Sequence, residues 1–175
     1  MQRISKPNPK ETIMKTLIIT AAAAIAAVGA AFALAPQHEV RTEIAVSASP
    51  ERVWNVLTDG AAYREWNPFI VDMKGTPKVG ETLENTMQPG GGSAMTFRPT
   101  VLVADKDREF RWLGRLIAPR IFDGEHYFLL EETATGTRLV PGERFQGILL
   151  WAIDTEQFRA DYERMNAALK ARAEG

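Results

Sequence analysis

Apolar and polar residues alternate along much of the chain between Glu39 and Gln146, as they do in strands with one buried face. The alternation begins in Glu39–Val46, where every second side chain is apolar or threonine and most of the others are charged. Glycine- and proline-rich turns separate six further predicted strands: Phe69–Lys74, Thr82–Gln88, Met95–Ala104, Glu109–Leu116, Gly124–Glu132 and Thr137–Gln146. Because most of these turns are short, the pattern predicts an antiparallel meander.

Helix signals follow the first strand and end the chain. Ser49-Pro50-Glu51 combines a capping hydroxyl, a proline at the first helical position and an acidic residue near the positive end of the dipole. A second short helix over Ala61–Trp66 is predicted to end at Asn67-Pro68. The only long predicted helix follows Asp154, which resembles the start of a capping box, and its apolar stripe comprises Phe158, Tyr162, Met165 and Leu169.

An uncharged segment rich in alanine, Thr16–Pro36, precedes these elements, and basic residues at 3, 6, 10 and 15 precede the segment. This order is typical of a signal peptide, with Ala31-Phe32-Ala33 as a cleavage site. About 20 apolar residues can also span a bilayer as an uncleaved anchor, although alanine favours cleavage after Ala33. Met14-Lys15 is a candidate start as well as Met1. We therefore expect residues 1–35 to be a signal peptide or membrane anchor, and residues 36–175 to be one domain in the periplasm or cell envelope.

The composition of residues 36–175 excludes several functional classes. They carry 17 basic and 21 acidic residues, a formal charge of −4, which argues against binding to nucleic acid. The chain has no cysteine and therefore no disulfide framework, lipoprotein attachment site or thiol nucleophile. The oligomeric state stays open.

Two predicted strands within Phe110–Leu130 have an unusual set of side chains on one face. Read at period two, one face of the first strand carries Phe110, Trp112, Gly114 and Leu116, and one face of the second carries His126, Phe128 and Leu130. A lone imidazole among apolar side chains is costly to bury unless another group bonds it. The combination suits the wall of a pocket better than a plain core.

Glu143 is the other polar residue that alternation places inside, on the same face as Leu139 and Phe145. A buried carboxylate needs a partner, and His126 on a neighbouring predicted strand can reach it. The two could form a general acid/base pair, a polar anchor for a ligand or a structural pair.

Neither a metal nor a cofactor is predicted. Asp123, Glu125 and His126 do not share a face, so they do not form a metal site by spacing. Gly90-Gly91-Gly92 lacks the strand and helix context of a phosphate-binding loop, and no Ser-His-Asp order is visible.

The order of elements and five short motifs resemble the SRPBCC superfamily, the polyketide cyclase/dehydrase and lipid-transfer group related to START domains. The resemblance covers Glu39–Ala173, and its motifs are SPERVW from Ser49, WNPF from Trp66, WLGR from Trp112, FDGEH from Phe122 and ERF from Glu143. It implies an α+β helix-grip fold, in which a curved antiparallel sheet wraps around the long C-terminal helix and encloses a hydrophobic cavity. The loop at Gly90-Gly91-Gly92 lies where relatives place a cavity gate, and the alternative, which the glycines favour, is an irregular hairpin turn.

Fold alone does not fix chemistry, so the function has to be argued from the residues. The predicted concavity is lined by aromatic side chains and carries few polar groups, and we therefore expect binding or carriage of a small hydrophobic or lipid-like ligand without its transformation. The alternative is an enzyme of cyclase, dehydratase or hydrolase type that uses Glu143 and His126 for proton transfer. The candidate ligand-binding residues are Trp66, Phe69, Trp112, Phe122, His126, Phe128, Glu143 and Phe145.

Overall fold

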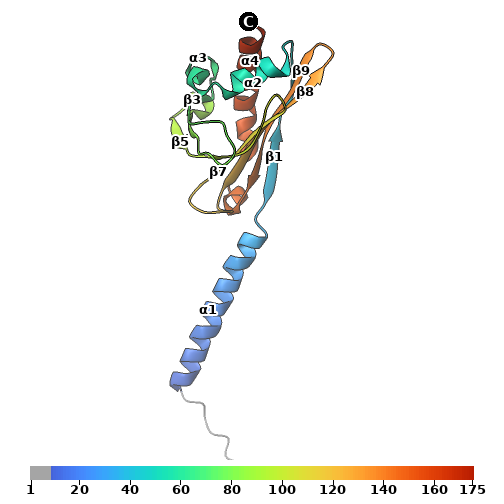
Figure 1. Cartoon of the computed structure of the whole chain (residues 1–175). Helices are drawn as coiled ribbons and strands as arrows, with labels where there is room; N and C mark the ends of the chain where they lie inside the picture. Colours follow the sequence, from blue (N-terminus) through green and yellow to red (C-terminus); the bar gives the residue numbers. More distant parts are fainter. Residues whose placement is uncertain (1–8) are drawn as a thin grey trace, which may run out of the picture. The chain divides into compact units, whose positions relative to one another are not determined.

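The structure is a computed structural model that describes residues 9–175. Arg3 and Lys6, two of the basic residues that precede the uncharged segment, lie outside the described residues. The chain separates into two compact units (Figure 1). The first unit ends at Ala35 and the second begins at Pro36. Each unit is described by itself.

The first unit consists of helix α1, Pro9–Ala33, whose side chains are not buried against any other part of the described chain. Twenty-five residues at 1.5 Å each give a helix about 37 Å long, enough to cross the hydrocarbon core of a bilayer. The mean hydropathy of its most apolar window is 2.2. Signal sequences share this length and composition, so the signal-peptide and anchor interpretations both stay open.

The second unit is built on a large antiparallel sheet with the strand order β1-β9-β8-β7-β6, and β2 also pairs with β9. These strands are β1 Gln37–Arg41, β2 Ile44–Val46, β6 Thr100–Asp105, β7 Glu109–Arg115, β8 Asp123–Thr133 and β9 Gly136–Gln146. A second sheet contains β3 Ile70–Lys74, β4 Glu84–Met87 and β5 Met95–Phe97, in that order.

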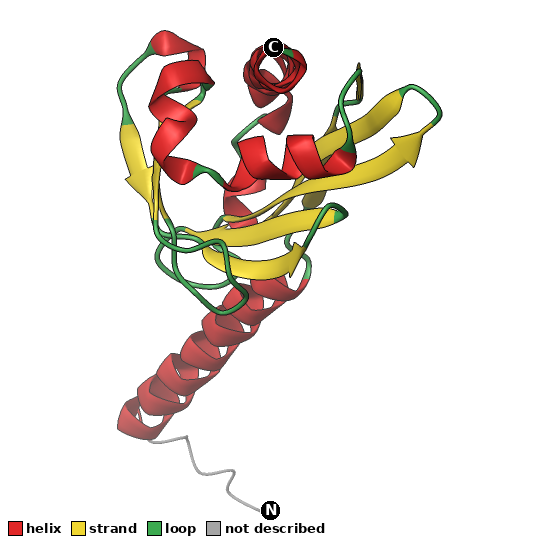
Figure 2. Cartoon of the chain, turned by 45° about the horizontal axis from the view of Figure 1, so that its top comes forward, coloured by secondary structure: helices red, strands yellow, loops and turns green. Residues whose placement is uncertain are grey.

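The helices cover the concave side of the large sheet. Helix α2, Pro50–Thr58, begins at the predicted cap, where the Ser49 hydroxyl accepts a hydrogen bond from the Arg52 amide. The short helices η1, Gly60–Ala62, and α3, Tyr63–Trp66, follow. The long helix α4, Arg159–Glu174, lies across the sheet and buries Met165 and Leu169 completely. Figure 2 looks nearly along α4 and shows the strands curving around it, which confirms the predicted helix-grip fold.

Three details of the predicted elements are wrong. The single meander is two sheets, because Met95–Ala104 divides into β5 and β6 at Pro99, which has no amide hydrogen to donate to a ladder. The first predicted strand is also broken, since Thr42 turns its amide and hydroxyl to the Pro141 carbonyl between β1 and β2. Asp154 caps the 3₁₀ turn η4, Thr155–Phe158, and not α4 itself.

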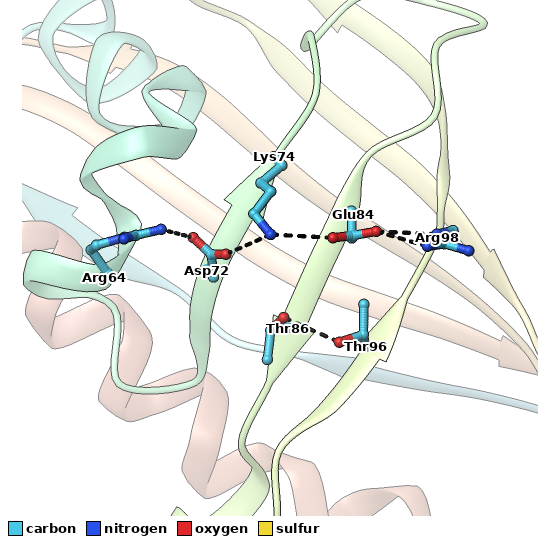
Figure 3. A network of polar contacts seen from close by, with 7 residues as sticks. All are labelled: Arg64, Asp72, Lys74, Glu84, Thr86, Thr96 and Arg98. Atoms are coloured by element: carbon cyan, nitrogen blue, oxygen red, sulfur yellow. Dashed lines mark hydrogen bonds and ion pairs between the residues drawn. The ribbon is translucent and has the colours of Figure 1, made fainter.

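The outer face of the small sheet is polar. Charges of opposite sign alternate across it in the order Arg64, Asp72, Lys74, Glu84 and Arg98, and the hydroxyls of Thr86 and Thr96 lie 3.2 Å apart (Figure 3). Because side chains alternate along a strand, the neighbours of Glu84 and Thr86 on β4 point to the other side. Those neighbours, Asn85 and Met87, line the pocket described next.

Candidate functional site

A pocket lies where the concave face of the large sheet, the inner face of the small sheet and the start of α4 meet. Its lining is mostly apolar and comes from both sheets and from the turns at one end of the domain: Ile70, Asn85, Met87, Pro89, Met95, Phe97, Pro99, Trp112, Gly114, Arg115, Leu116, Phe122, Gly124, His126, Glu143, Phe145, Phe158 and Tyr162. The cavity volume is about 90 Å³, and the unfilled space is about 720 Å³ when the open mouth is included. The interior is therefore narrow in this conformation.

Three polar side chains meet in the wall of this pocket. His126 on β8 and Glu143 on β9 are cross-strand partners, and His126 Nδ1 lies 3.2 Å from Glu143 Oε2. Tyr162 on α4 donates its hydroxyl to the same carboxylate oxygen. Because a carboxylate only accepts, His126 carries its hydrogen on Nδ1 in this contact. Two donors thus compensate the burial of Glu143, whose side chain is 13% exposed.

Aromatic rings hold the imidazole of His126 in place. Trp112, its cross-strand partner on β7, stacks on it with ring centroids 4.9 Å apart and planes 7° apart. Phe128 and Tyr162 pack on its other sides at 4.8 and 5.3 Å. The ring therefore has little freedom to turn away from Glu143, and the predicted pair is brought together.

Two glycines make room for the cluster. Gly114 and Gly124 face each other across β7 and β8, one step along the face from Trp112 and His126. A side chain at Gly124 would collide with the carboxylate of Glu143, whereas one at Gly114 would meet only the Gly124 carbonyl, at 3.8 Å. The carboxylate of Glu143 thus occupies space that a larger residue at Gly124 would fill.

Two buried polar atoms of the lining have no partner within the described chain: Asn85 Oδ1 and His126 Nε2. Both side chains are only 2% exposed. With its hydrogen on Nδ1, a neutral His126 offers Nε2 as an acceptor, as Asn85 offers its Oδ1. Buried acceptors without partners are costly, so these two atoms stand out as contact points for a ligand.

Burial raises the pKa of Tyr162 well above its ordinary value of 10.0, and the neighbouring carboxylate of Glu143 adds to the effect. The phenol therefore keeps its proton at neutral pH and remains a hydrogen-bond donor.

A turn closes one side of the pocket. The 3₁₀ turn η2, Pro89–Gly91, contributes Pro89 to the lining. The Gly90 amide donates to both carboxylate oxygens of Asp161 at 3.0 and 3.2 Å, and Asp161 is 4% exposed on α4. The buried carboxylate of Asp161, the residue directly before Tyr162, thus joins the turn η2 to α4.

The predicted ligand-binding residues divide into two groups. Those in the pocket lining are Trp112, Phe122, His126, Glu143 and Phe145. Phe69 and Phe128 lie instead in the fully buried core, and Trp66 packs against Tyr63 outside this pocket, at 4.9 Å between ring centroids. Nothing tests whether any of the eight binds a ligand, so that role stays a prediction.

Sequence reasoning missed several lining residues, above all Tyr162 and Asn85. By its spacing Tyr162 belongs to the apolar stripe of the last helix, and only the arrangement of α4 over β9 shows that its hydroxyl donates to Glu143. Asn85 carried a usable signal, because an amide between the apolar positions Leu83 and Met87 of a strand is unexpected on an inward face.

Asp123 and Glu125 have other partners than a metal. Glu125 pairs with Arg111, and Asp123 accepts from the Arg120 amide. Within residues 9–175, no group of three His, Cys, Asp or Glu side chains is arranged to hold a metal ion.

The chain is similar in structure to proteins of low sequence identity. Protein CV1439 from Chromobacterium violaceum is 20% identical and has a TM-score of 0.63 over 78% of this chain and 98% of its own. Mll3558 from Rhizobium loti is 21% identical, with a TM-score of 0.62 over 79% and 98%. The di-domain ARO/CYC BexL of the BE-7585A biosynthetic pathway is 13% identical, with a TM-score of 0.60 over 79% of this chain and 49% of its own. At such identities these likenesses establish the fold alone.

A search of curated proteins found no match to this chain. The family model described as polyketide cyclase / dehydrase and lipid transport matches residues 37–174, almost the whole second unit. The resemblance to the SRPBCC superfamily is confirmed, and the chain belongs to the polyketide cyclase/dehydrase and lipid transport family.

Proposed function

We propose that the domain binds a small hydrophobic ligand in the pocket between its two sheets and α4, and that it does not transform the ligand. The observation that carries the proposal is the pocket itself, an apolar concavity with a few convergent polar groups, which is the usual form of a small-molecule site. The description of the family, which includes lipid transport, agrees with this class of ligand.

The polar groups of the lining suggest what the ligand carries besides its apolar body. Asn85 Oδ1 and His126 Nε2 are acceptors without partners, and the Glu143 carboxylate lies beside them. A hydroxyl or another uncharged donor would satisfy such acceptors, while a carboxylate would be repelled by Glu143. The ligand class that fits is an apolar molecule with a hydroxyl group, rather than a free fatty acid.

The narrow interior indicates that the domain opens to take up its ligand. An interior of about 90 Å³ holds a few waters. We propose that this opening displaces the turn η2, which the hydrogen bonds from Gly90 to Asp161 join to α4.

The test uses a substitution that takes up space in the pocket from one position of its wall. Gly114→Phe places a ring in the pocket from a position where a side chain meets little, and Leu113→Phe, one residue away on the opposite face of β7, is the matched control. An apolar fluorescent dye should bind the wild type and Leu113→Phe and should not bind Gly114→Phe. Native mass spectrometry of the chain from its own cells then identifies the ligand. Equal dye binding by all three chains would contradict the proposal.

A second candidate function is proton-transfer catalysis by Glu143 and His126. It is favoured by one observation, the 3.2 Å contact of the two side chains in the pocket wall, which is within reach for a general acid/base pair. Glu143→Gln separates the candidates. Loss of turnover of an identified ligand with unchanged affinity marks an enzyme, whereas unchanged chemistry and weaker binding mark a binding site.

We also propose that the domain is exported, with α1 as a signal peptide or as a membrane anchor. The support is the length and hydropathy of α1. N-terminal sequencing of the exported form should give a start near Leu34 if the helix is cleaved. A cytoplasmic protein with residues 33 and 34 still joined would contradict export.

A further inference from the structure

The exposed large apolar side chains of the second unit are gathered at one end. Four of the six, here called the apolar rim, are Met95, Leu116, Ile117 and Trp151, with exposed fractions of 49, 41, 88 and 60%. Met95 and Leu116 also line the pocket, so the rim borders its mouth. An apolar surface around a pocket mouth is typical of a site that meets another apolar phase.

The loop between β7 and β8 carries the centre of this rim outward. Ile117 has a φ of 65°, a left-handed conformation that is rare for a β-branched residue. The Ile148 and Leu149 amides donate to the Arg120 and Ile121 carbonyls at 3.0 and 3.1 Å, which fixes the loop against the 3₁₀ turn η3, Ile148–Trp151. The structure thus holds an isoleucine and a tryptophan in water at the same end of the domain.

The charges beside the rim fit a lipid surface. Arg115 and Arg120, both exposed, flank the apolar tip Leu116–Pro119. Apolar side chains bordered by arginine, with a tryptophan beside them, are the pattern of membrane-interface segments. The acidic groups nearest in the chain are Asp123, which lies 3.6 Å from Arg115, Asp154, which caps η4, and Glu156, which pairs with Arg159.

The place where the chain enters the domain also favours a lipid surface at the rim. The Gly147 amide, directly before η3, donates to the Pro36 carbonyl at 3.2 Å, so the domain begins at the end that carries the rim. Two residues, Leu34 and Ala35, separate Pro36 from Ala33, the last residue of α1, so the chain from Ala33 to Pro36 spans at most about 10 Å. If α1 stays in a bilayer as the uncleaved anchor proposed above, the chain therefore leaves the bilayer and enters the domain at the end that carries the rim.

We infer that the apolar rim docks on a lipid bilayer, with Ile117 and Trp151 inserted among the head groups and the pocket mouth facing the lipid. The docking stands without the ligand proposal, because it rests on the exposed side chains and on the place where the chain enters the domain. If the ligand proposal also holds, an apolar ligand passes between bilayer and pocket without crossing water.

The absence of cysteine from the chain gives a direct test. Ile117→Cys in the full chain takes a single environment-sensitive fluorophore, and Ala134→Cys in the exposed β8–β9 hairpin is the control. In the register of β8 and β9 the hairpin lies ten residues from the Asp123–Gln146 pair, about 33 Å along the strands, and Figure 1 shows it at the far end of the domain from the start of β1. Nanodiscs that hold one chain each exclude contacts between copies.

The fluorophore at residue 117 should emit at shorter wavelength than the one at residue 134. Nitroxide-labelled lipid in the disc should quench it several-fold more strongly. Both substituted positions are exposed, so the fold should be unchanged, which far-ultraviolet circular dichroism checks. Equal emission and equal quenching at the two positions would overturn the inference, even if the apolar dye still binds the pocket.

Discussion

Removal of the Tyr162 hydroxyl tests whether the carboxylate of Glu143 is buried and paired as the structure shows. Tyr162→Phe keeps the ring, which is 1% exposed, and leaves no cavity. It removes one of the two donors to a carboxylate whose side chain is 13% exposed. A hydrogen bond to a charged group contributes about 1.5–3 kcal/mol, and little water can replace this one, so we expect a loss near the upper value.

Tyr127→Phe is a close control. Tyr127 is also 1% exposed and donates to a glutamate, Glu39, at 2.8 Å, but that side chain is 41% exposed and also accepts from Arg144. Water and Arg144 can compensate there, so we expect a loss of about 1 kcal/mol. Urea unfolding of the full chain in mild detergent, followed by tryptophan fluorescence, gives both free energies. Equal losses would refute the assignment of Glu143 as a buried, paired carboxylate.

Three further predictions concern other parts of the domain. Burial, with help from Glu39, raises the pKa of Tyr127 to about 12. The contribution of its protonated phenol to stability is therefore full below pH 10 and is lost as the pH rises from 10 to 12. Over that range the unfolding free energy of Tyr127→Phe should fall less steeply than that of the wild type. Gly124→Ala should cost about 1–3 kcal/mol in thermal or urea unfolding because the new methyl group meets the Glu143 carboxylate, while Gly114→Ala should be nearly neutral, and similar costs would contradict the description of the wall. Asp161→Asn should speed hydrogen exchange at the Gly90 amide several-fold, whereas Asp154→Asn, which weakens the cap of η4, should leave that amide unchanged.

Most elements of the fold could be predicted because their signals are local. Ser49-Pro50 fixes the start of α2 through its own side chains, and the alternation of β7 to β9 records one buried face in each strand. The division at Pro99 has a local signal, because a proline interrupts a ladder, but the break at Thr42 depends on which carbonyl lies opposite. The partner of Thr42, Pro141, is 99 residues away, and no local pattern contains that information.

The candidate site, like the fold, could be predicted only where its signals are local. The pairing of His126 with Glu143 could be predicted, because both lie on inward faces of strands joined by one short hairpin, and a hairpin fixes its own register. Tyr162 could not be assigned to the site, because its role depends on where α4 crosses β9. The aromatic residues could not be divided between core and lining, because Phe128 and Trp112 share one face and differ only in which of them borders the gap left by Gly114 and Gly124.

Two features of the pocket wall lower the stability of the fold, and both have the same explanation. Gly114 leaves open a position where an added methyl group would meet nothing closer than the Gly124 carbonyl, at 3.8 Å, and filling it would bury more apolar surface. In the same place Glu143, a residue that is expensive to bury, is held by His126 and Tyr162, where an apolar residue of similar volume would need no partners. Sequences depart from such local rules chiefly at functional sites. A gap and a satisfied carboxylate side by side, with the acceptors of Asn85 and His126 unpaired, are therefore better explained by a ligand than by folding.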